Sequence, residues 1–194
     1  KVDICVIGGG FTGISSALYL AQKGYSVALC EARTLGWGAS GRNGGHLGIG
    51  MRKDQIYLEN KLGFDHAKKL WNLGLEAVDE TKKLISKFKI ECALNQGIIC
   101  AGFYKRNRDE FLFEIDHMQK HYNFDGYKFL DNSEIKTEIN TEMYHSGLLN
   151  KYNFHINPLK LLLGLAQELV KLKVNIYEYT PINKILDEQQ VIKI

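Results

Sequence analysis

Residues 2–13 read VDICVIGGGFTG, and this stretch decides the fold. The apolar run 2–7 is typical of a short buried strand, and it leads directly into glycines spaced as G-x-G-x-x-G. Behind them, apolar residues at 14, 17, 18 and 21 recur at helical spacing, and Gly24 stands where a helix ends. A second apolar run, YSVALC at 25–30, ends in Glu31. The stretch predicts a strand–helix–strand unit that opens a mostly parallel α/β sheet with helices on its faces.

Each glycine of the predicted turn has its own task. Gly8 permits the tight turn from strand to helix, Gly10 lets a diphosphate approach the backbone, and Gly13 lets the helix pack closely on the strand. The helix N-terminus offers N–H groups and a partial positive charge to phosphate oxygens. Glu31 lies near the spacing expected of a carboxylate that binds a ribose 2′-hydroxyl, and an acid there would repel the 2′-phosphate of NADP. We therefore expect a dinucleotide site, with a purely structural glycine turn as the alternative.

Composition excludes several classes of protein. The 194 residues carry a net charge of only +3 and no basic stripe with interleaved aromatics, so we expect no nucleic-acid partner. No apolar run approaches the ~20 residues of a membrane span, and no cleavable signal peptide is visible. The four cysteines form no C-x-x-C pair, and Cys5 and Cys30 fall in the presumed core strands. Buried, reduced thiols and a cytoplasmic location follow as expectations.

The ends of the chain suggest a fragment. The sequence starts just before the first strand without an initiator Met, and it stops at residues 191–194 inside an apparent strand. We expect a longer parent protein.

Residues 32–48, ARTLGWGASGRNGGHLG, form an unusual segment. They hold six glycines, which indicates backbone that turns sharply or approaches a ligand closely. A disordered linker is the alternative. Against it, the segment carries Trp37, Arg42, Asn43 and His46 and lacks the Ser, Pro and Lys bias of a linker.

Three strings together resemble a known family: VIGGGFTG at 6–13, EAR at 31–33 and GASGRNGG at 38–45. They are similar to the FAD-binding front half of the D-amino-acid-oxidase-like flavoproteins, which include glycine oxidase, sarcosine oxidase and D-amino-acid dehydrogenase. GASGRNGG is closest to the gamma-glutamylputrescine oxidase branch. The resemblance is dense over 2–50, returns around 155–182 and is loose between. It implies FAD as the cofactor.

The resemblance also implies a domain plan. Residues 1–50 and 156–194 would form a discontinuous Rossmann-like FAD-binding domain, and 51–155 an inserted α+β substrate region over the flavin. Local patterns predict the following elements: helical structure over 54–88, strand–turn–strand over 91–104 with its turn at 95–97, a helix over 105–122, a strand at 127–130, a short helix capped at 131–133, an extended stretch over 144–156, a helix from 158, a strand at 174–177, and a hairpin of 185–186 with 191–192.

The expected cofactor contacts follow from the same resemblance. They are Gly8, Gly10, Phe11, Thr12, Gly13, Glu31, Ala32, Arg33, Ala39, Ser40, Arg42, Asn43, Gly44, Gly45, His46, Pro181 and Ile182. Pro181 and Ile182 would meet the adenine. Arg42 stands where some relatives carry a histidine that bonds the flavin, so non-covalent FAD is expected. Arg42 would contact the diphosphate or the reduced ring, or be an exposed loop arginine. His46 is either a flavin-ring neighbour or a structural histidine.

The implied reaction is oxidation of a C–N bond in an amine or amino acid. Hydride would pass to flavin N5, water would hydrolyse the imine, and O2 or an electron carrier would reoxidise the flavin. A gamma-glutamylputrescine-like amine is the favoured substrate, before glycine, sarcosine or D-amino acids, and no dedicated catalytic base is assigned. The alternatives are an NAD-dependent Rossmann dehydrogenase, which the glycine-rich segment disfavours, and a non-catalytic dinucleotide-binding fragment.

No metal site is expected. His117 and His121 stand four residues apart on a predicted helix, but no third ligand accompanies them. A solvated helix face is the preferred interpretation.

Overall fold

The computed structural model describes residues 1–187 and 192–193. The chain divides into two compact units. The first unit comprises Lys1–Gly45, Lys83–Ala93 and Ile156–Ile194, and the second comprises His46–Lys82 and Leu94–His155. Residues 83–93 thus group with the first unit, although the domain plan drawn from the sequence placed all of 51–155 in one region. The reason is packing: Ile90 fills the space beside Gly164, and Asn157 N–H donates to the Cys92 carbonyl at 2.7 Å.

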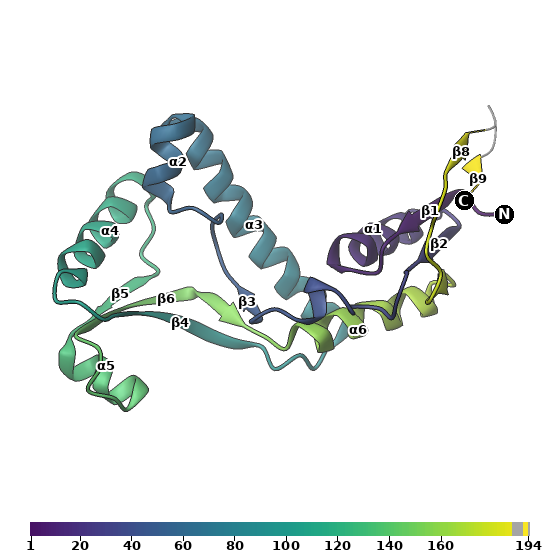
Figure 1. Cartoon of the computed structure of the whole chain (residues 1–194). Coiled ribbons are helices and arrows are strands. Elements are labelled where there is room, and N and C mark those ends of the chain that lie inside the picture. The colour runs from purple at the N-terminus through teal and green to yellow at the C-terminus, as the bar shows by residue number, and fades with distance from the viewer. Residues whose placement is uncertain (188–191, 194) are drawn as a thin grey trace. The chain divides into compact units, whose positions relative to one another are not determined.

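The first unit is a parallel sheet in the order β1–β2–β7 with helices beside it (Figure 1). Its elements are β1 (Ile4–Ile7), α1 (Phe11–Gln22), β2 (Val27–Cys30), the 3₁₀ turn η1 (Ala39–Gly41), α6 (Pro158–Lys171) and β7 (Asn175–Tyr177). Ile14, Leu29, Leu162 and Leu169 are fully buried and form its core. The predicted α/β fold, opening with a parallel strand–helix–strand unit, is confirmed.

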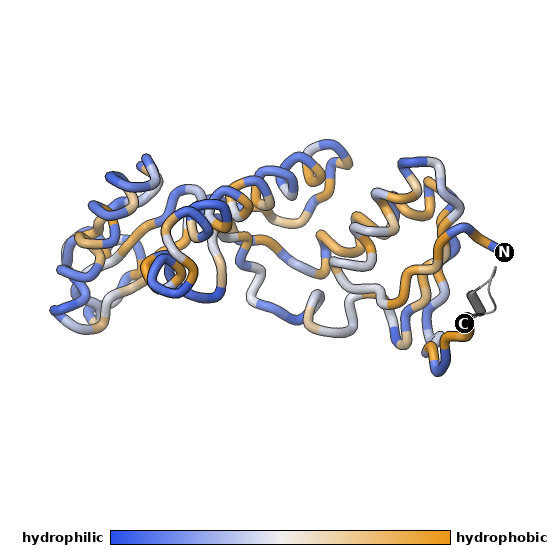
Figure 2. The backbone as a smooth tube through the Cα atoms, turned by 90° about the horizontal axis from the view of Figure 1, so that it is seen from above, coloured by the Kyte–Doolittle hydropathy of each residue, from blue (hydrophilic) through white to orange (hydrophobic). Residues whose placement is uncertain are grey.

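The second unit is an antiparallel sheet centred on β6 (Ser146–His155). Its other elements are β3 (His46–Leu47), α2 (Gln55–Leu62), α3 (Phe64–Phe88, of which residues 83–88 belong to the first unit), β4 (Asn95–Gly102), α4 (Asn107–Tyr122), β5 (Tyr127–Leu130) and α5 (Asn132–Ile139). α3 is amphipathic: hydrophilic and hydrophobic residues alternate along its coil in Figure 2. Ala67, Trp71 and Val78 form its buried stripe.

The strand–turn–strand prediction for 91–104 is wrong. β4 is one continuous strand, and residues 95–97 lie inside it. The pairing with β6 shifts register between Gln96 and Ile98, and Gly97 has φ +97°. Because a glycine at positive φ is common both in strand irregularities such as G1 bulges and in hairpin turns, the local sequence could not separate them.

Other local predictions hold. Asp131 and Glu134 form a reciprocal capping box at the start of α5, and Asn157 caps α6 with Pro158 in the first turn. The predicted hairpin is present as β8 (Leu186–Asp187) paired with β9 (Ile192–Lys193); Val191 lies outside the described residues. The helical stretch 54–88 is two helices, divided at Gly63, where φ is +80°.

A buried polar network joins α2 to α4 in the second unit. Gln55 Nε2 donates to the Ala67 carbonyl at 2.7 Å and to Tyr122 Oη at 2.9 Å. Tyr122 Oη donates in turn to Glu59 at 2.7 Å, and His117 Nε2 lies 2.9 Å from the same carboxylate oxygen. The His117 side chain is only 15% exposed, so the prediction of a solvated helix face is wrong for this residue. Its hydrogen-bond partner, Glu59, lies 58 positions away in the sequence.

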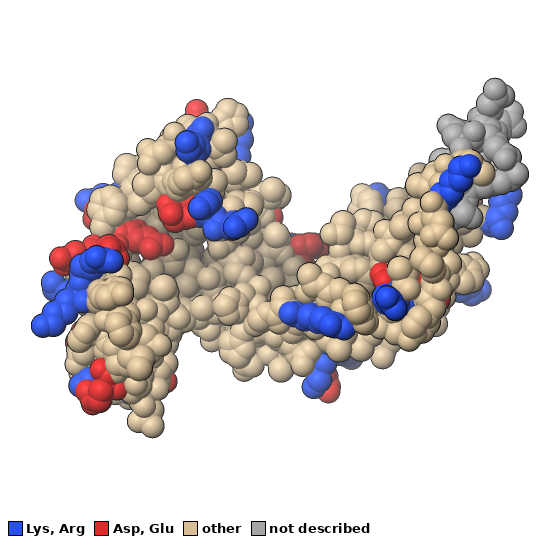
Figure 3. Space-filling model, in the orientation of Figure 1, with Lys and Arg blue, Asp and Glu red and all other residues tan. Residues whose placement is uncertain are grey.

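Over residues 1–187 and 192–193, no helix combines the length and apolarity needed to cross a membrane. On the face shown in Figure 3, acidic and basic side chains are interspersed. The surface ion pairs of the second unit include Lys128–Glu134 and Lys120–Asp116.

Candidate functional site

The turn between β1 and α1 depends on two glycines for its shape. Gly8 has φ +104°, and its N–H donates to the Cys30 carbonyl at 2.8 Å. A Cβ at Gly13 would overlap the Gly8 carbonyl oxygen and lie 3.4 Å from Val6. The helix therefore approaches the strand at a distance that only glycine allows.

A third glycine, Gly9, matters as much, although the sequence motif treats its position as free. A Cβ there would collide with Leu35 and crowd the Glu31 side chain. The Gly9 N–H donates to Glu31 Oε2 at 2.6 Å, and the Gly9 carbonyl accepts from Gly36 N–H at 3.1 Å. In the sequence, only the run of three consecutive glycines at 8–10 indicates that Gly9 also has a structural role.

The N-terminus of α1 has no cap from its own N-cap residue. That residue is Gly10, and the first turn holds no acid. Instead Ser40 Oγ, from the glycine-rich segment, accepts the Phe11 N–H at 3.0 Å. A Cβ on Gly10 would approach Ser40 Oγ to 2.9 Å. The first turn of α1 thus contributes no carboxylate of its own at the positive end of the helix dipole, which suits a phosphate group.

Glu31 stands at the end of β2 and faces the same turn. One carboxylate oxygen accepts from Gly9 N–H and the other from Arg33 N–H at 2.8 Å. Its main chain pairs with the segment after β7, since the Glu31 carbonyl accepts from Thr180 N–H at 2.8 Å. A carboxylate oxygen has more than one lone pair, so Glu31 can still accept from a hydroxyl. Its contact with a ribose stays a prediction.

The glycine-rich segment is hydrogen-bonded at several points rather than free like a linker. Asn43 Nδ2 donates to the carbonyls of Ala39 and Ser40 at 3.0 Å each, while Asn43 Oδ1 accepts from Gly45 N–H at 2.8 Å. Gly45 has φ +70°, and its carbonyl accepts from Ile156 N–H. The alternative of a disordered linker is wrong.

Two arginines flank the indole of Trp37. The guanidinium of Arg42 lies 4.5 Å from the ring centroid and that of Arg33 lies 5.4 Å from it. Both arginines are exposed, and Trp37 is half exposed. Stacking on the indole restricts each guanidinium while leaving its N–H groups available to an anion.

The remaining predicted contacts fall into three groups. Thr12, Ala32 and Gly44 are exposed beside residues already described. Pro181 and Ile182 follow Thr180, which pairs with Glu31. His46 lies in β3 of the second unit, paired with His155. Its place beside the flavin ring stays a prediction, as do the other contacts.

These features fit a dinucleotide such as FAD. A helix whose first turn holds no acid, a carboxylate at the end of the second strand and two exposed guanidinium groups match the diphosphate and ribose of such a cofactor. No residue of this first-unit site pairs an acid with a base, so the chemistry would come from the cofactor.

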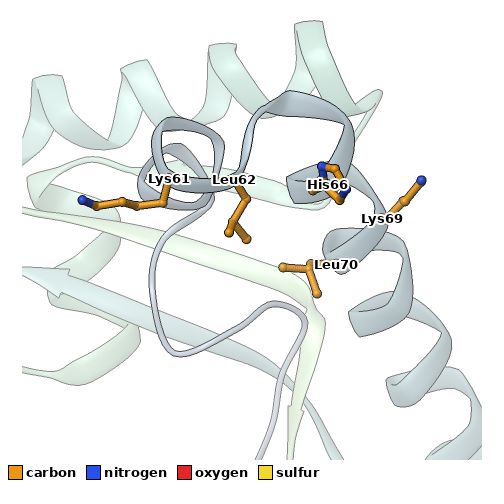
Figure 4. A pocket seen from close by; sticks show the side chains of 5 residues that line it. All are labelled: Lys61, Leu62, His66, Lys69 and Leu70. Atoms are coloured by element: carbon orange, nitrogen blue, oxygen red, sulfur yellow. The ribbon is translucent and has the colours of Figure 1, made fainter.

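The second unit holds a concavity of about 520 Å³ between α2 and α3 (Figure 4). Leu62 and Leu70 point toward each other there, whereas the ammonium ends of Lys61 and Lys69 point away from it. His66 completes the lining. The polar groups that line this concavity do not point toward a common centre. The concavity therefore offers no catalytic arrangement.

Comparison with known proteins decides the family. Residues 3–194 match the family model DAO, described as FAD dependent oxidoreductase. The chain belongs to this family. FAD is accordingly the cofactor of the family, as the sequence predicted, and the NAD alternative is not favoured.

Individual relatives agree with the DAO assignment. The chain is 32% identical over 192 residues to "Probable oxidoreductase OrdL" of Haemophilus influenzae, which covers 99% of this chain and 44% of the relative. It is 33% identical over 186 residues to "Gamma-glutamylputrescine oxidoreductase" of Escherichia coli, covering 94% and 43%. The solved structure of glycine oxidase from Geobacillus kaustophilus shares the fold at a TM-score of 0.76 and 19% identity, covering 98% of this chain and 50% of that one. The chain thus spans less than half the length of these curated relatives.

Proposed function

We propose that this DAO-family chain is the FAD-binding front part of an oxidoreductase that oxidises a C–N bond of an amine or amino acid. A gamma-glutamylputrescine-like amine is the favoured substrate. The observation that carries the proposal is the 33% identity over 94% of the chain to a protein named for gamma-glutamylputrescine. The string GASGRNGG at 38–45, held in place by Asn43, adds to it.

The residues of the first unit would bind and orient the cofactor non-covalently. The first turn of α1 would donate N–H groups to the diphosphate, Glu31 would accept from the ribose, and Pro181 with Ile182 would lie against the adenine. Bound FAD supplies the hydride acceptor for the amine carbon. O2 or an electron carrier would regenerate it, and a cytoplasmic location stays a prediction.

Arg42 is proposed as a positioning residue for the cofactor. Its stacking on Trp37 fixes a positive charge a few residues from Ser40, which touches the α1 N-terminus. A guanidinium there would contact the diphosphate or offset negative charge on the reduced ring. His46 is proposed as a neighbour of the ring, and 51–155 as the substrate region.

The decisive experiment is a visible absorption spectrum of the protein with its full reading frame, followed by anaerobic addition of amines. Bleaching of the flavin bands by gamma-glutamylputrescine supports the whole proposal. Bleaching only by glycine, sarcosine or D-amino acids retains the reaction class and rejects the favoured substrate. A flavin spectrum that no amine bleaches rejects amine oxidation and leaves a dinucleotide-binding protein.

Two variants test the positioning residues. Arg42→Ala should lower FAD retention or shift the flavin potential, while Arg52→Ala, an exposed arginine of the second unit, should change neither. Retention and potential both equal to wild type would remove Arg42 from the site. His46→Gln should alter the pH dependence of turnover, and an unchanged profile would leave His46 a structural residue.

A further inference from the structure

Two cysteines lie side by side on one face of the first-unit sheet. In the β1–β2 register Cys5 pairs with Ala28 and Ile7 pairs with Cys30, so Cys5 and Cys30 project from the same face. Val6 projects from the other face, where α1 packs closely enough that a Cβ on Gly13 would lie 3.4 Å from it. The two thiols therefore face away from α1.

The sulfur atoms of this pair are 4.0 Å apart, and neither is in a disulfide. Cys30 is 6% exposed, whereas Cys5 is only partly buried, so the prediction of buried thiols holds for Cys30 but not fully for Cys5. Ile7, on the same face, is 51% exposed. Cys5 is thus the more exposed residue of the pair.

We propose that Cys5 and Cys30 form a two-thiolate site for a soft monovalent cation, Cu(I). Metal–sulfur bonds of about 2.3 Å would bridge sulfurs at this separation with an S–metal–S angle of about 120°, the angle of trigonal coordination. Thiolates are the ligands that Cu(I) prefers.

The number of ligands argues against zinc. A structural Zn²⁺ needs four protein ligands in a tetrahedron. Among residues 1–187 and 192–193, no group of three or more His, Cys, Asp or Glu side chains is placed to hold a metal. A site with two sulfur ligands suits Cu(I), whose third position would go to solvent or a small thiol.

Binding is an exchange of protons for the cation. Burial, together with the neighbouring Cys30 thiol, raises the pKa of Cys5 to about 11, so the Cys5 thiol keeps its proton at neutral pH without a metal. Two S–H bonds break, two Cu–S bonds form, and two protons leave to solvent with no change of oxidation state. The bridge would join β1 to β2 one residue before Glu31, and it depends on no property of the FAD site.

The test is a titration of the FAD-free chain with Cu(I), under anaerobic conditions, against a chromophoric Cu(I) chelator. We expect one tightly held Cu(I) per chain in wild type and in the Cys92→Ser/Cys100→Ser double variant, which retains only the proposed pair. Cys5→Ser and Cys30→Ser should each lose at least tenfold in affinity. Thermal unfolding should shift upward with Cu(I) only in the proteins that bind it.

Each other outcome overturns the proposal. Binding that persists in Cys5→Ser/Cys30→Ser, or that disappears in Cys92→Ser/Cys100→Ser, would place the ion on the other cysteines. Because Cys92→Ser/Cys100→Ser leaves Cys5 and Cys30 unchanged, it tests the proposal even if the Cys5 and Cys30 variants misfold. An intact mass two hydrogens lower, without bound copper, would show a disulfide in place of the metal site.

Discussion

The two units hold their polar groups together in different ways. In the first unit the candidate site is made largely of main-chain atoms brought close by glycines, as at Gly13 against the Gly8 carbonyl. In the second unit polar side chains do this work, through the network of Gln55, Glu59 and Tyr122. A site built from backbone should tolerate no added methyl group, whereas a side-chain network should fail on loss of a single hydroxyl.

The largest effect is expected at the β1–α1 turn. Gly13→Ala should cost about 3 kcal/mol of stability, because its Cβ overlaps a carbonyl that cannot move without the strand. Gly38→Ala is the matched control, since nothing lies within 4 Å of its added Cβ and its φ is −78°. Urea unfolding of both variants measures the difference. Equal unfolding midpoints for the two variants would show that the turn adjusts easily to an added methyl group, and would contradict the contrast drawn between the two units.

The next effect is expected in the second-unit network. Tyr122→Phe removes the hydroxyl between Gln55 and Glu59 and should cost about 2 kcal/mol, because buried polar groups lose their partner. Burial and the adjacent Glu59 raise the pKa of Tyr122 to about 12, so this hydroxyl remains a donor at neutral pH. Tyr19→Phe, on an exposed tyrosine, is the control. A loss no greater than in Tyr19→Phe would mean that water replaces the hydroxyl.

Asn43 sharpens the comparison, because it is a side chain that shapes a backbone site. Asn43→Ala should cost about 1 kcal/mol, since Asn43 makes three hydrogen bonds within an exposed loop. FAD affinity, followed by quenching of flavin fluorescence, should fall more than stability does. An unchanged FAD affinity would show that cofactor binding does not depend on the hydrogen bonds that Asn43 makes in the loop.

The smallest effect depends on pH. Burial raises the pKa of Glu114 above its ordinary value of 4.5, with Asp54 adding to the shift and the hydrogen bond from Tyr127 opposing it. The folded protein therefore keeps a proton that the unfolded chain releases, and stability falls as pH rises from 4.5 toward the folded-state pKa. Glu114→Gln should gain stability relative to wild type at pH 7 but not at pH 4. Unfolding at both pH values, with exposed Glu76→Gln as control, measures this; a gain equal at both would contradict it.

Local sequence patterns predicted much of the fold. Periodicity and capping residues located α1, α5 and α6, because those signals act within one or two turns of chain. They failed where one residue type serves two local structures, as Gly97 does in the bulge of β4. They also failed at His117, because an amphipathic pattern does not identify the distant residue, here Glu59, that forms a hydrogen bond with a polar side chain.

The sequence by itself determined the strand–turn–helix, the acid that follows the second strand and the glycine-rich segment that points to FAD. Each of these is encoded in consecutive residues whose φ angles and spacing admit few conformations. Only the tertiary structure decided that Ser40 caps α1 across 29 positions and that Cys5 meets Cys30 across 25. Such contacts depend on which strands pair and on how closely the helices approach them. Tertiary packing decides both, and the local sequence of one segment does not specify which distant segment it will contact.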